Sequence, residues 1–594
     1  MSSISTLRTR ASVLVLVLVV QLFLVALVRD PASAAVGSAD DRQLTTSTGW
    51  WTYTGVTGSQ VSSLLSSNNA RITDLSVVDP ATPTFNVTMV RNTGAYASGY
   101  WWYYGQTAAQ VSSALSSNNA RLITAQAYPT SAGTRFAVVM VPNSGANQKA
   151  WWWFYNISAS SLASQLSSRN ARLVHLTQYP GTSNFTAVMV SNTGTDNTGW
   201  WWYHHTTTSS ISSALSTNSA RLVDLSRNSD GTWNAVMYKS TGPRWYWYYG
   251  LSLGSAVSRA DQLGERIIDV TRYGSSVAVV MTRNTTATNE KLWNLIGPEV
   301  DSGAYGFYLK QVGGSVLAGL QQSKQYEPAS ALKVLYHAKS IREESLGNTT
   351  DSTVVTYHYK NLSDSKDGNI CPDNYSTTTT TNLKNADTLM MQVSDNRMTR
   401  AILERYTKAS VLSYGTSLGL TSTAINHNIG CPTDTTHNRT TLSDLGKVYE
   451  AFQKGTVTGS STWKTQFRSR MLNQSNFSGF KNAICPVVNA EATALGRSSA
   501  TATSFCNAMT WIAKGGSYQY GSSLPYQVSR DNVSLTGVPY KRSGVVSPRY
   551  FVFGEYVDGT TINTSAESTS VDTARGKLYP EALRPYIRAA LATW

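Results

Sequence analysis

The stretch that decides the fold is Glu327-Pro328-Ala329-Ser330-Ala331-Leu332-Lys333, and the residues after it, through Ile341, predict a buried helix. Ser330 and Lys333 are three residues apart on the first turn of this helix, so their side chains share a face and the amine reaches the hydroxyl. A serine hydroxyl becomes an effective nucleophile when an adjacent base takes its proton. Lysine is such a base where burial or a nearby cation favours its neutral form.

Two further motifs follow this pair along the chain. Ser394-Asp395-Asn396 lies between two predicted helical segments, and Lys514-Gly515-Gly516-Ser517 lies on a predicted strand. A Ser/Lys pair alone is common on helices, whereas the ordered set of three motifs is specific. The order resembles that of the penicillin-binding proteins and class A β-lactamases.

The resemblance implies a catalytic role for five side chains. Ser330 attacks a carbonyl group to form an acyl-enzyme, and Lys333 accepts its proton. Ser394 relays a proton to the leaving nitrogen, and Asn396 orients Lys333 and the substrate. Lys514 supplies positive potential beside the nucleophile.

The resemblance also implies an α+β fold and a substrate site. It covers residues 296–594 and predicts an antiparallel sheet flanked by helices. The backbone N–H groups of Ser330 and Ser517 are expected to form the oxyanion hole. Gly515 and Gly516 are expected to contact the substrate.

One departure from the class A β-lactamases concerns the residue that activates water. Those enzymes deacylate with a glutamate on a loop after the Ser-Asp-Asn motif. Here no Glu occurs between Glu404 and Glu450. Asp434 in this loop is the alternative base, although its spacing does not require that role. The departure favours a peptide bond over an antibiotic as the substrate.

The first half of the chain contains five tandem repeats over residues 40–292, with a period of about fifty residues. Each begins with an aromatic run such as Trp101-Trp102-Tyr103-Tyr104, passes through a Ser/Ala/Leu segment to an arginine, and ends in a second β-rich run. This order predicts a strand, a short helix and two more strands. One such unit cannot bury its own apolar face, so the five either stack in an open array or close into a ring.

The tryptophans and the arginines of the repeats have two interpretations each. Neighbouring strand residues point to opposite faces, so one Trp of each pair is expected in the core. Its neighbour either packs as well, which we favour, or forms an aromatic surface for glycan or peptide. We expect a structural role for the repeated arginines, which are Arg71, Arg121, Arg172, Arg221 and Arg266.

Trp-rich tandem repeats ahead of a β-lactamase-like domain are similar to the architecture of the secreted polyglycine hydrolases. That resemblance implies an endopeptidase that cleaves Gly-Gly bonds, with the linker of a plant chitinase as its protein partner. Two other functions stay open. One is a β-lactamase or D-Ala-D-Ala carboxypeptidase, and the other is a non-catalytic protein that binds cell-wall glycan through the repeats.

The N-terminus predicts a secreted protein. Arg8 and Arg10 precede a long apolar run, and Ala32-Ser33-Ala34 provides a cleavage site, so residues 1–34 are expected to be a signal peptide. An uncleaved anchor is the alternative interpretation of the apolar run. We expect cleavage, an extracellular protein, and no stable membrane association afterwards.

The cysteines and the net charge limit the kinds of ligand and partner that we expect. The four cysteines form no Cys-x-x-Cys pair, which argues against zinc, and their even number predicts two disulfides. The sequence does not fix their pairing; we expect Cys371 with Cys431 and Cys485 with Cys506. Sequons such as Asn156 suggest a glycoprotein. The net charge of +15 is diffuse, which fits anionic polymers better than nucleic acid. No cofactor is expected.

Overall fold

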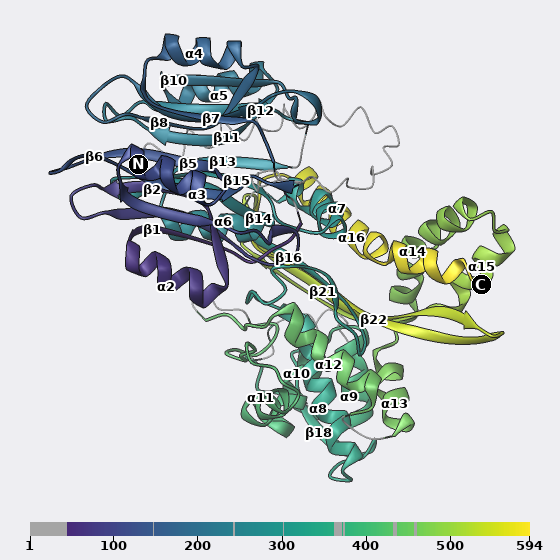
Figure 1. Ribbon diagram of the computed structural model, residues 1–594. Coiled ribbons are helices and arrows are strands. Elements are labelled where there is room, and N and C mark those ends of the chain that lie inside the picture. The colour runs from purple at the N-terminus through teal and green to yellow at the C-terminus, as the bar shows by residue number, and fades with distance from the viewer. Residues whose placement is uncertain are drawn as a thin grey trace. The chain divides into compact units, whose positions relative to one another are not determined.

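The computed structural model describes residues 44, 46–145, 148–241, 244–300, 302–361, 371, 373, 375–431, 436–456 and 460–594. They divide into two compact units, one ending at Thr285 and the other beginning at Thr286 (Figure 1). The predicted signal peptide and Asp434 lie outside the described residues. Among the helices that belong to the described ranges, none is long and apolar enough to cross a membrane.

The first unit contains five copies of the predicted repeat, each a three-stranded antiparallel sheet with its third strand in the middle. The first strands are β1 (Trp50–Thr57), β4 (Trp101–Gln106), β7 (Trp151–Ile157), β10 (Trp200–Thr206) and β13 (Trp245–Leu251). The helices are α2 (Gly58–Asn68), α3 (Ala108–Ser117), α4 (Ala159–Ser168), α5 (Thr208–Thr217) and α6 (Leu253–Leu263). The second strands are β2 (Ala70–Asp79), β5 (Ala120–Thr130), β8 (Ala171–Gln178), β11 (Ala220–Arg227) and β14 (Glu265–Tyr273). The third strands are β3 (Thr84–Arg91), β6 (Gly133–Pro142), β9 (Phe185–Ser191), β12 (Trp233–Lys239) and β15 (Ser276–Arg283).

Each repeat helix starts at a hydroxyl cap and packs on its own sheet. In the first repeat the Thr57 side chain accepts the backbone N–H of Gln60, while the Gln60 side chain accepts the N–H of Thr57. The helix then buries Val61 and Leu65 in one cluster with Ile72 of β2. The predicted helical spacing of the apolar residues is confirmed.

The five sheets close into a ring rather than an open array. The second strands lie side by side in chain order, β2 against β5, β5 against β8, β8 against β11 and β11 against β14, and β14 returns to β2 and β3. At the seam, Asn284 donates its side-chain N–H to the carbonyl of Thr48 at 2.9 Å and accepts the Thr48 N–H at 3.1 Å. Closure protects the sheet edges that an array would expose at its two ends.

Buried polar residues join neighbouring blades of the ring, where each blade is one repeat. Asp269 Oδ2 accepts the backbone N–H of Leu225 at 2.8 Å, and Asp224 Oδ2 accepts that of Leu176 at 2.9 Å. The five repeated arginines are all buried, with exposed fractions between 0% and 3%. Arg71, for example, donates its Nε–H to the carbonyl of Tyr96 at 2.7 Å. These contacts agree with the structural role expected for the arginines.

Aromatic side chains fill the spaces between blades. Phe85 of β3 meets Trp102 and Tyr104 of the next repeat edge to face, with ring centroids 6.0 and 5.3 Å apart. Phe136 meets Trp153 and Tyr155 of the following repeat in the same way. The aromatic runs therefore pack between blades and are partly buried there, while Tyr104 and Tyr155 near their ends are 41% and 45% exposed.

The second unit is built on one antiparallel five-stranded sheet in the order β17-β16-β22-β21-β20, with a separate two-stranded sheet of β18 and β19. Its strands are β16 (Ala304–Gln311), β17 (Val316–Leu320), β18 (Val354–His358), β19 (Thr378–Asn382), β20 (Thr510–Tyr520), β21 (Tyr526–Arg542) and β22 (Val545–Ile562). Its helices are α7 (Ala287–Ile296), α8 (Lys333–Ser345), α9 (Leu383–Gln392), α10 (Asn396–Tyr406), α11 (Lys408–Ser417), α12 (Leu442–Lys454), α13 (Ser461–Met471), α14 (Gln474–Ala494), α15 (Ser499–Ala508) and α16 (Ser565–Leu591).

Helices cover both faces of this sheet, as strand alternation requires. Phe551 and Phe553 of β22 point to one face, where they meet Tyr586 and Tyr579 of α16. Val552, between them, joins the opposite core cluster with residues of α8 and α12. The prediction of an α+β unit with an antiparallel sheet flanked by helices is confirmed.

Two disulfides cross-link the second unit. They join Cys371 to Cys431 and Cys485 to Cys506, the pairing expected from the sequence. The first links the region before β19 to the loop between α11 and α12, and the second links α14 to α15.

Candidate active site

The nucleophile candidate lies on a tight turn. Ser330 belongs to the 3₁₀ turn Ala329–Leu332, which runs directly into α8 at Lys333. The sequence predicted an α-helical turn here, and the structure has the tighter form. Ala329 has a φ of +44°, a conformation that non-glycine residues rarely adopt. Such strain is held at sites where the surrounding structure fixes the backbone.

Lys333 is fully buried beneath this turn and has three oxygen acceptors. Its Nζ donates to the carbonyl of Ser394 at 2.6 Å, to the hydroxyl of Ser394 at 3.1 Å and to Oδ1 of Asn396 at 2.7 Å. Burial, and then the charge of Lys514, hold the pKa of Lys333 well below the usual lysine value, although Asp395 opposes them. The neutral amine that a base requires is thus favoured.

The Ser-Asp-Asn motif lies where α9 ends and α10 begins. Asp395 caps α10 by accepting the backbone N–H groups of Arg397 and Met398 at 2.8 and 3.3 Å. Ser394 has a φ of +62°, so the chain turns sharply just before the cap. This turn directs the carbonyl and hydroxyl of Ser394 toward Lys333. The motif positions Lys333 from two sides.

Lys514 on β20 completes the group. Its Nζ donates to the hydroxyl of Ser394 at 3.0 Å and to the carbonyl of Gly515 at 3.0 Å. Burial lowers the pKa of Lys514 to about 8, with Asp531 opposing the shift. Hydrogen bonds therefore link four of the predicted catalytic residues, with Ser394 between the two lysines. The fifth, Ser330, lies on the turn three residues before Lys333, and its backbone nitrogen faces Gly516.

Gly516 sets the distance between β20 and the nucleophile turn. A Cβ atom on Gly516 would lie 2.8 Å from the backbone nitrogen of Ser330 and would also overlap the carbonyl of Pro328. Glycine is therefore the residue that fits. Ser517 is exposed and follows Gly516 on β20. Its N–H therefore belongs to the strand that borders Ser330.

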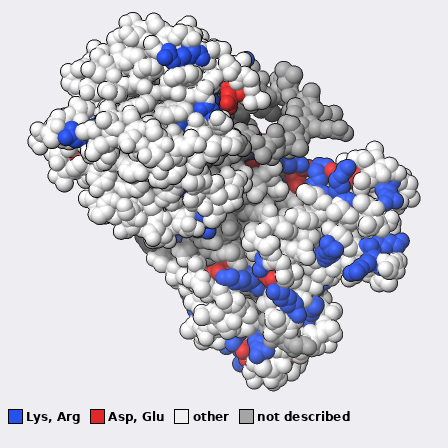
Figure 2. Space-filling model, in the orientation of Figure 1, with Lys and Arg blue, Asp and Glu red and all other residues white. Residues whose placement is uncertain are grey.

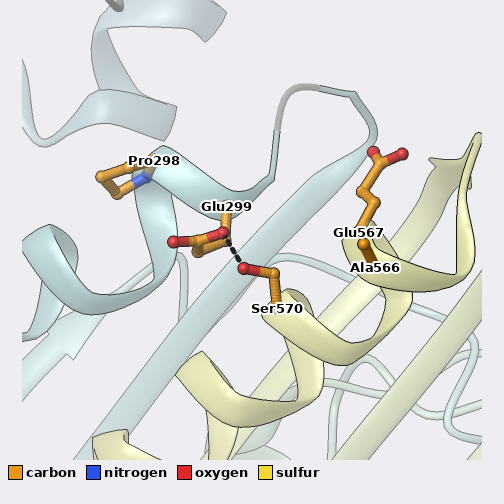
Figure 3. A pocket seen from close by; sticks show the side chains of 5 residues that line it. All are labelled: Pro298, Glu299, Ala566, Glu567 and Ser570. Carbon is orange, nitrogen blue, oxygen red and sulfur yellow. Dashed lines mark hydrogen bonds between the residues drawn. The ribbon is translucent and has the colours of Figure 1, made fainter. Parts of the chain in front are cut away.

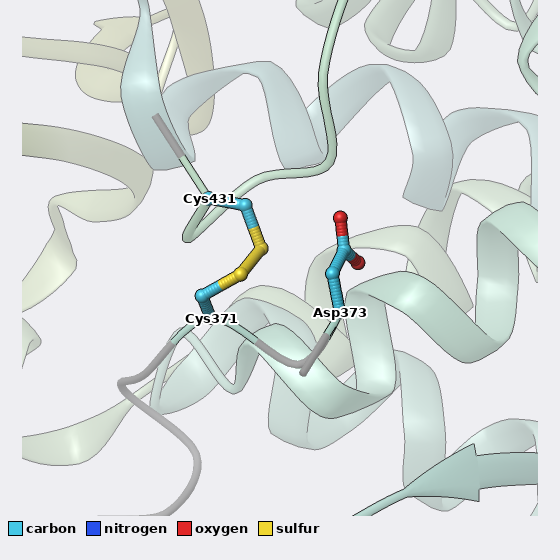
Figure 4. Close-up of side chains that lie close together, drawn as sticks. All are labelled: Cys371, Asp373 and Cys431. Atoms are coloured by element: carbon cyan, nitrogen blue, oxygen red, sulfur yellow. A yellow bond between two sulfur atoms is a disulfide. The ribbon is translucent and has the colours of Figure 1, made fainter. Parts of the chain in front are cut away.

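The loop between α11 and α12 forms a wall of the site. Gly430 packs on Asn396, since a Cβ atom there would lie 2.6 Å from Asn396 Cγ, and its N–H donates to the hydroxyl of Tyr518 at 3.0 Å. Cys431 is tied to Cys371, with the carboxylate of Asp373 beside the disulfide (Figure 4). Sulfurs in a disulfide are not thiolate ligands, and Asp373 instead accepts a hydrogen bond from Asn428 at 2.7 Å.

Three buried titratable residues near the site were not predicted from the sequence. They are Glu327, His427 and Asp531, all less than 10% exposed. Burial raises the pKa of Asp531 well above its usual value, which favours the neutral acid. Asp531 follows Arg530 and precedes Asn532 in a polar stretch of β21, so no sequence pattern marked it. Glu327 and His427 are far apart in the sequence and come together only in the folded protein.

A separate open pocket lies away from the predicted residues. Pro298, Glu299, Ala566, Glu567 and Ser570 line it, and the Ser570 hydroxyl donates to Glu299 at 2.6 Å (Figure 3). None of the predicted catalytic residues lines this pocket, which forms at the start of α16.

A protein-family model matches part of the second unit. Residues 287–503 match the model of the β-lactamase enzyme family, a span that includes Ser330, Lys333 and the Ser-Asp-Asn motif. No curated protein matches the chain. The second unit has a β-lactamase-like serine hydrolase fold.

Several solved structures resemble half of the chain. A β-lactamase from Chitinophaga pinensis is 14% identical with a TM-score of 0.37, covering 50% of this chain and 99% of its own. The chromosome-encoded β-lactamase of Vibrio parahaemolyticus is 13% identical with a TM-score of 0.36, covering 50% and 98%. A point mutant of PBP-A, in an acyl-enzyme complex with penicillin G, is 15% identical with a TM-score of 0.35, covering 50% and 96%.

Proposed function

We propose that this protein is a serine hydrolase that cleaves peptide bonds in glycine-rich chains through an acyl-enzyme. The observation that carries the proposal is the shared hydroxyl of Ser394, which lies 3.1 Å from the amine of Lys333 and 3.0 Å from that of Lys514. Burial, and then the charge of Lys514, lower the pKa of Lys333 and favour its neutral form, which serves as the base for a serine three residues away.

In the proposed acylation, Lys333 takes the proton of Ser330 as Oγ bonds to the substrate carbonyl carbon. The carbonyl π electrons move to the oxygen, which accepts hydrogen bonds from the N–H groups of Ser330 and Ser517. The C–N bond then breaks, and the proton held by Lys333 passes through the Ser394 hydroxyl to the leaving nitrogen. Water hydrolyses the resulting ester and frees Ser330.

Strand β20 supports a glycine-rich peptide as the substrate. It is an edge strand of the sheet, and it carries Gly515, Gly516 and Ser517 beside the nucleophile. An extended peptide adds to such an edge through main-chain hydrogen bonds. A glycine-rich segment suits this position, because a chain without side chains enters a narrow space and makes the same main-chain bonds.

The missing loop glutamate supports a peptide substrate over a β-lactam antibiotic. Residues 405–449 contain no Glu, so the group that activates water in class A β-lactamases has no counterpart there. A D-Ala-D-Ala peptide uses the same catalytic groups and remains the alternative peptide substrate.

The proposed setting is outside the cell, with a protein substrate such as a plant chitinase linker. The two disulfides fit an oxidising compartment. On the face shown in Figure 2, basic side chains are spread out with acidic ones among them and form no continuous stripe. That distribution supports an anionic cell-wall polymer over nucleic acid as a contact. The exposed rings of Tyr104 and Tyr155 are the proposed glycan contacts of the repeats.

The test is a substrate panel read by mass spectrometry. Purified protein is incubated with a glycine-rich linker peptide, a D-Ala-D-Ala peptide and a cephalosporin, beside the Ser330→Ala variant. Cleavage between glycines that is lost in Ser330→Ala is expected. Turnover of the cephalosporin alone would move the proposal to a β-lactamase. No turnover and no labelling by a fluorophosphonate would move it to a binding protein.

A further inference from the structure

Glu327 is a buried carboxylate three residues before Ser330. Its side chain is 1% exposed, and Oε1 accepts the backbone N–H of Ala329 at 3.1 Å. Ala329 is the residue with a φ of +44° that directly precedes the nucleophile. A hydrogen bond from this strained residue to a charged acceptor fixes the turn more firmly than one to a neutral acceptor.

The second oxygen of the same carboxylate faces two histidines from the loop between α11 and α12. Oε2 lies 3.5 Å from Nε2 of His427 and 3.6 Å from Nδ1 of His437. His427 is buried, whereas His437 is about one quarter exposed. One carboxylate thus meets the nucleophile turn on one side and the loop on the other.

The loop reaches the catalytic groups from this anchor. Asn438 is fully buried, and its Oδ1 accepts the N–H groups of Asn426 and His427 at 2.8 and 3.1 Å, so these residues are joined to the segment that carries Asn438. Three residues after His427, Gly430 packs on the Asn396 side chain that accepts from Lys333. The contact between His427 and Glu327 and the contact between Gly430 and Asn396 are thus only three residues apart on the chain.

We propose that Glu327 is a positioning residue that couples the turn presenting Ser330 to the loop packed on Asn396, with His427 and His437 as the links. The proposal rests on the proposed function, because it concerns the reactivity of Ser330. Glu327 acts through these neighbours. It differs from the five predicted catalytic residues in requiring no contact with the substrate.

Protonation of His427 strengthens the coupling. Burial lowers the pKa of His427, but the hydrogen bond to Glu327 and the carbonyl of Asn428 outweigh it and raise the pKa above the usual histidine value. The charged groups that face His427 are Glu327, which raises the pKa, and Lys408, which lowers it; Tyr518 packs beside the ring. Because the pKa is raised in the folded protein, the stabilisation is complete below the unfolded value and is lost as pH rises through the folded value.

The experiment compares the full-length protein with Glu327→Gln, His427→Gln and the double variant. The readouts are the rate of fluorophosphonate labelling at Ser330, kcat and KM on a glycine-rich peptide, the pH profile, and the melting temperature. Glu404→Gln is the matched control, because Glu404 lies 3.2 Å from His358 in a similar pair at the far end of α10.

Glu327→Gln is expected to lower the labelling rate and kcat about 10- to 100-fold with KM little changed, since displacement of a reacting group by an ångström has effects of that size. His427→Gln is expected to lower them less and to remove the histidine ionisation from the pH profile. The double variant is expected to resemble Glu327→Gln alone.

Three results overturn the proposal. The first is that Glu327→Gln folds and keeps the wild-type labelling rate and kcat. The second is that the losses of the two single variants add in the double variant. The third is that His427→Gln leaves the pH profile unchanged. If Glu327→Gln does not fold, the last measurement still decides on the single histidine variant. If the wild-type protein neither labels at Ser330 nor cleaves peptide, the proposed function fails instead, so the two failures are distinguishable.

Discussion

Lys333 and Lys514 donate to the same oxygen atom, the hydroxyl of Ser394, at 3.1 and 3.0 Å. The two lysines are 181 residues apart in the chain and come from the first turn of α8 and from the edge strand β20. Two positive charges this close repel each other, so protonation of one amine favours the neutral form of the other. That division assigns the base to Lys333 and the positive potential to Lys514.

Removal of the charge at Lys514 is expected to shift the pH profile. Lys333 must be neutral to act, so kcat/KM rises with pH through its pKa. Burial and then the charge of Lys514 lower this pKa, and Lys514→Met removes the second cause, so the acidic limb is expected to move to higher pH. Rates on a glycine-rich peptide from pH 5 to 9 measure the shift.

Lys514→Arg is the matched control, because it keeps the charge and leaves the acidic limb in place. An acidic limb that stays unchanged in Lys514→Met would show that Lys514 does not set the protonation of Lys333. The wild-type rate is also expected to fall as pH rises through about 8, where Lys514 loses its proton.

A methyl group at Gly516 is expected to lower kcat strongly while the protein remains folded. The added Cβ would meet the Ser330 nitrogen at 2.8 Å and would force β20 away from the nucleophile turn. Displacement of that order lowers kcat about 100-fold or more. Peptide cleavage and circular dichroism of Gly516→Ala measure the two effects.

Gly479→Ala controls for the substitution itself, because Gly479 lies on α14 with open space around its Cβ position. It should keep full activity and gain up to about 1 kcal/mol of stability. Full activity in Gly516→Ala would mean that β20 does not border the reacting atoms.

The two disulfides are expected to differ in their effect on activity. Replacing Cys371 and Cys431 by serine frees the loop that carries Gly430, which packs on Asn396. Loss of a native disulfide costs about 2–5 kcal/mol, and here kcat is expected to fall as well. Melting temperature and peptide cleavage are measured on the same preparation.

The Cys485→Ser/Cys506→Ser variant provides the comparison, because that disulfide joins α14 to α15 and not the loop. It is expected to lose stability and keep the kcat of the folded protein. Equal losses of kcat in both variants would remove the special role of the loop.

The seam of the repeat ring is expected to depend on Asn284. Asn92, Asn143 and Asn192 each accept a nearby N–H six residues ahead, whereas Asn284 accepts the N–H of Thr48, 236 residues back. Asn284→Ala therefore removes two long-range hydrogen bonds between partly buried groups, at about 0.5–1.5 kcal/mol each. Denaturant unfolding of the full chain measures it.

Asn143→Ala removes the corresponding local hydrogen bonds within one linker and is expected to cost less. A larger loss of stability in Asn143→Ala than in Asn284→Ala would contradict closure at this seam.

The sequence predicted the residues that share a local motif, and missed those that meet only on folding. Ser330 and Lys333 were identifiable because a helical turn places them together, and Lys514 because its motif has a fixed order. Glu327 and His427 are 100 residues apart and belong to no motif, so their proximity follows from the packing of the loop alone. Ring closure could not be decided from the sequence for the same reason. An Asn follows the third strand in four of the five repeats, and this recurrence was a usable signal.

The central claim is that Ser330 is acylated by a glycine-rich peptide. The most direct measurement is acid quenching of the protein with such a peptide during turnover, followed by intact mass and peptide mapping. We expect a covalent adduct of the N-terminal peptide fragment on Ser330, absent in Ser330→Ala, together with cleavage between glycines. Cleavage at the wild-type rate by Ser330→Ala, or an adduct on another residue, would contradict it.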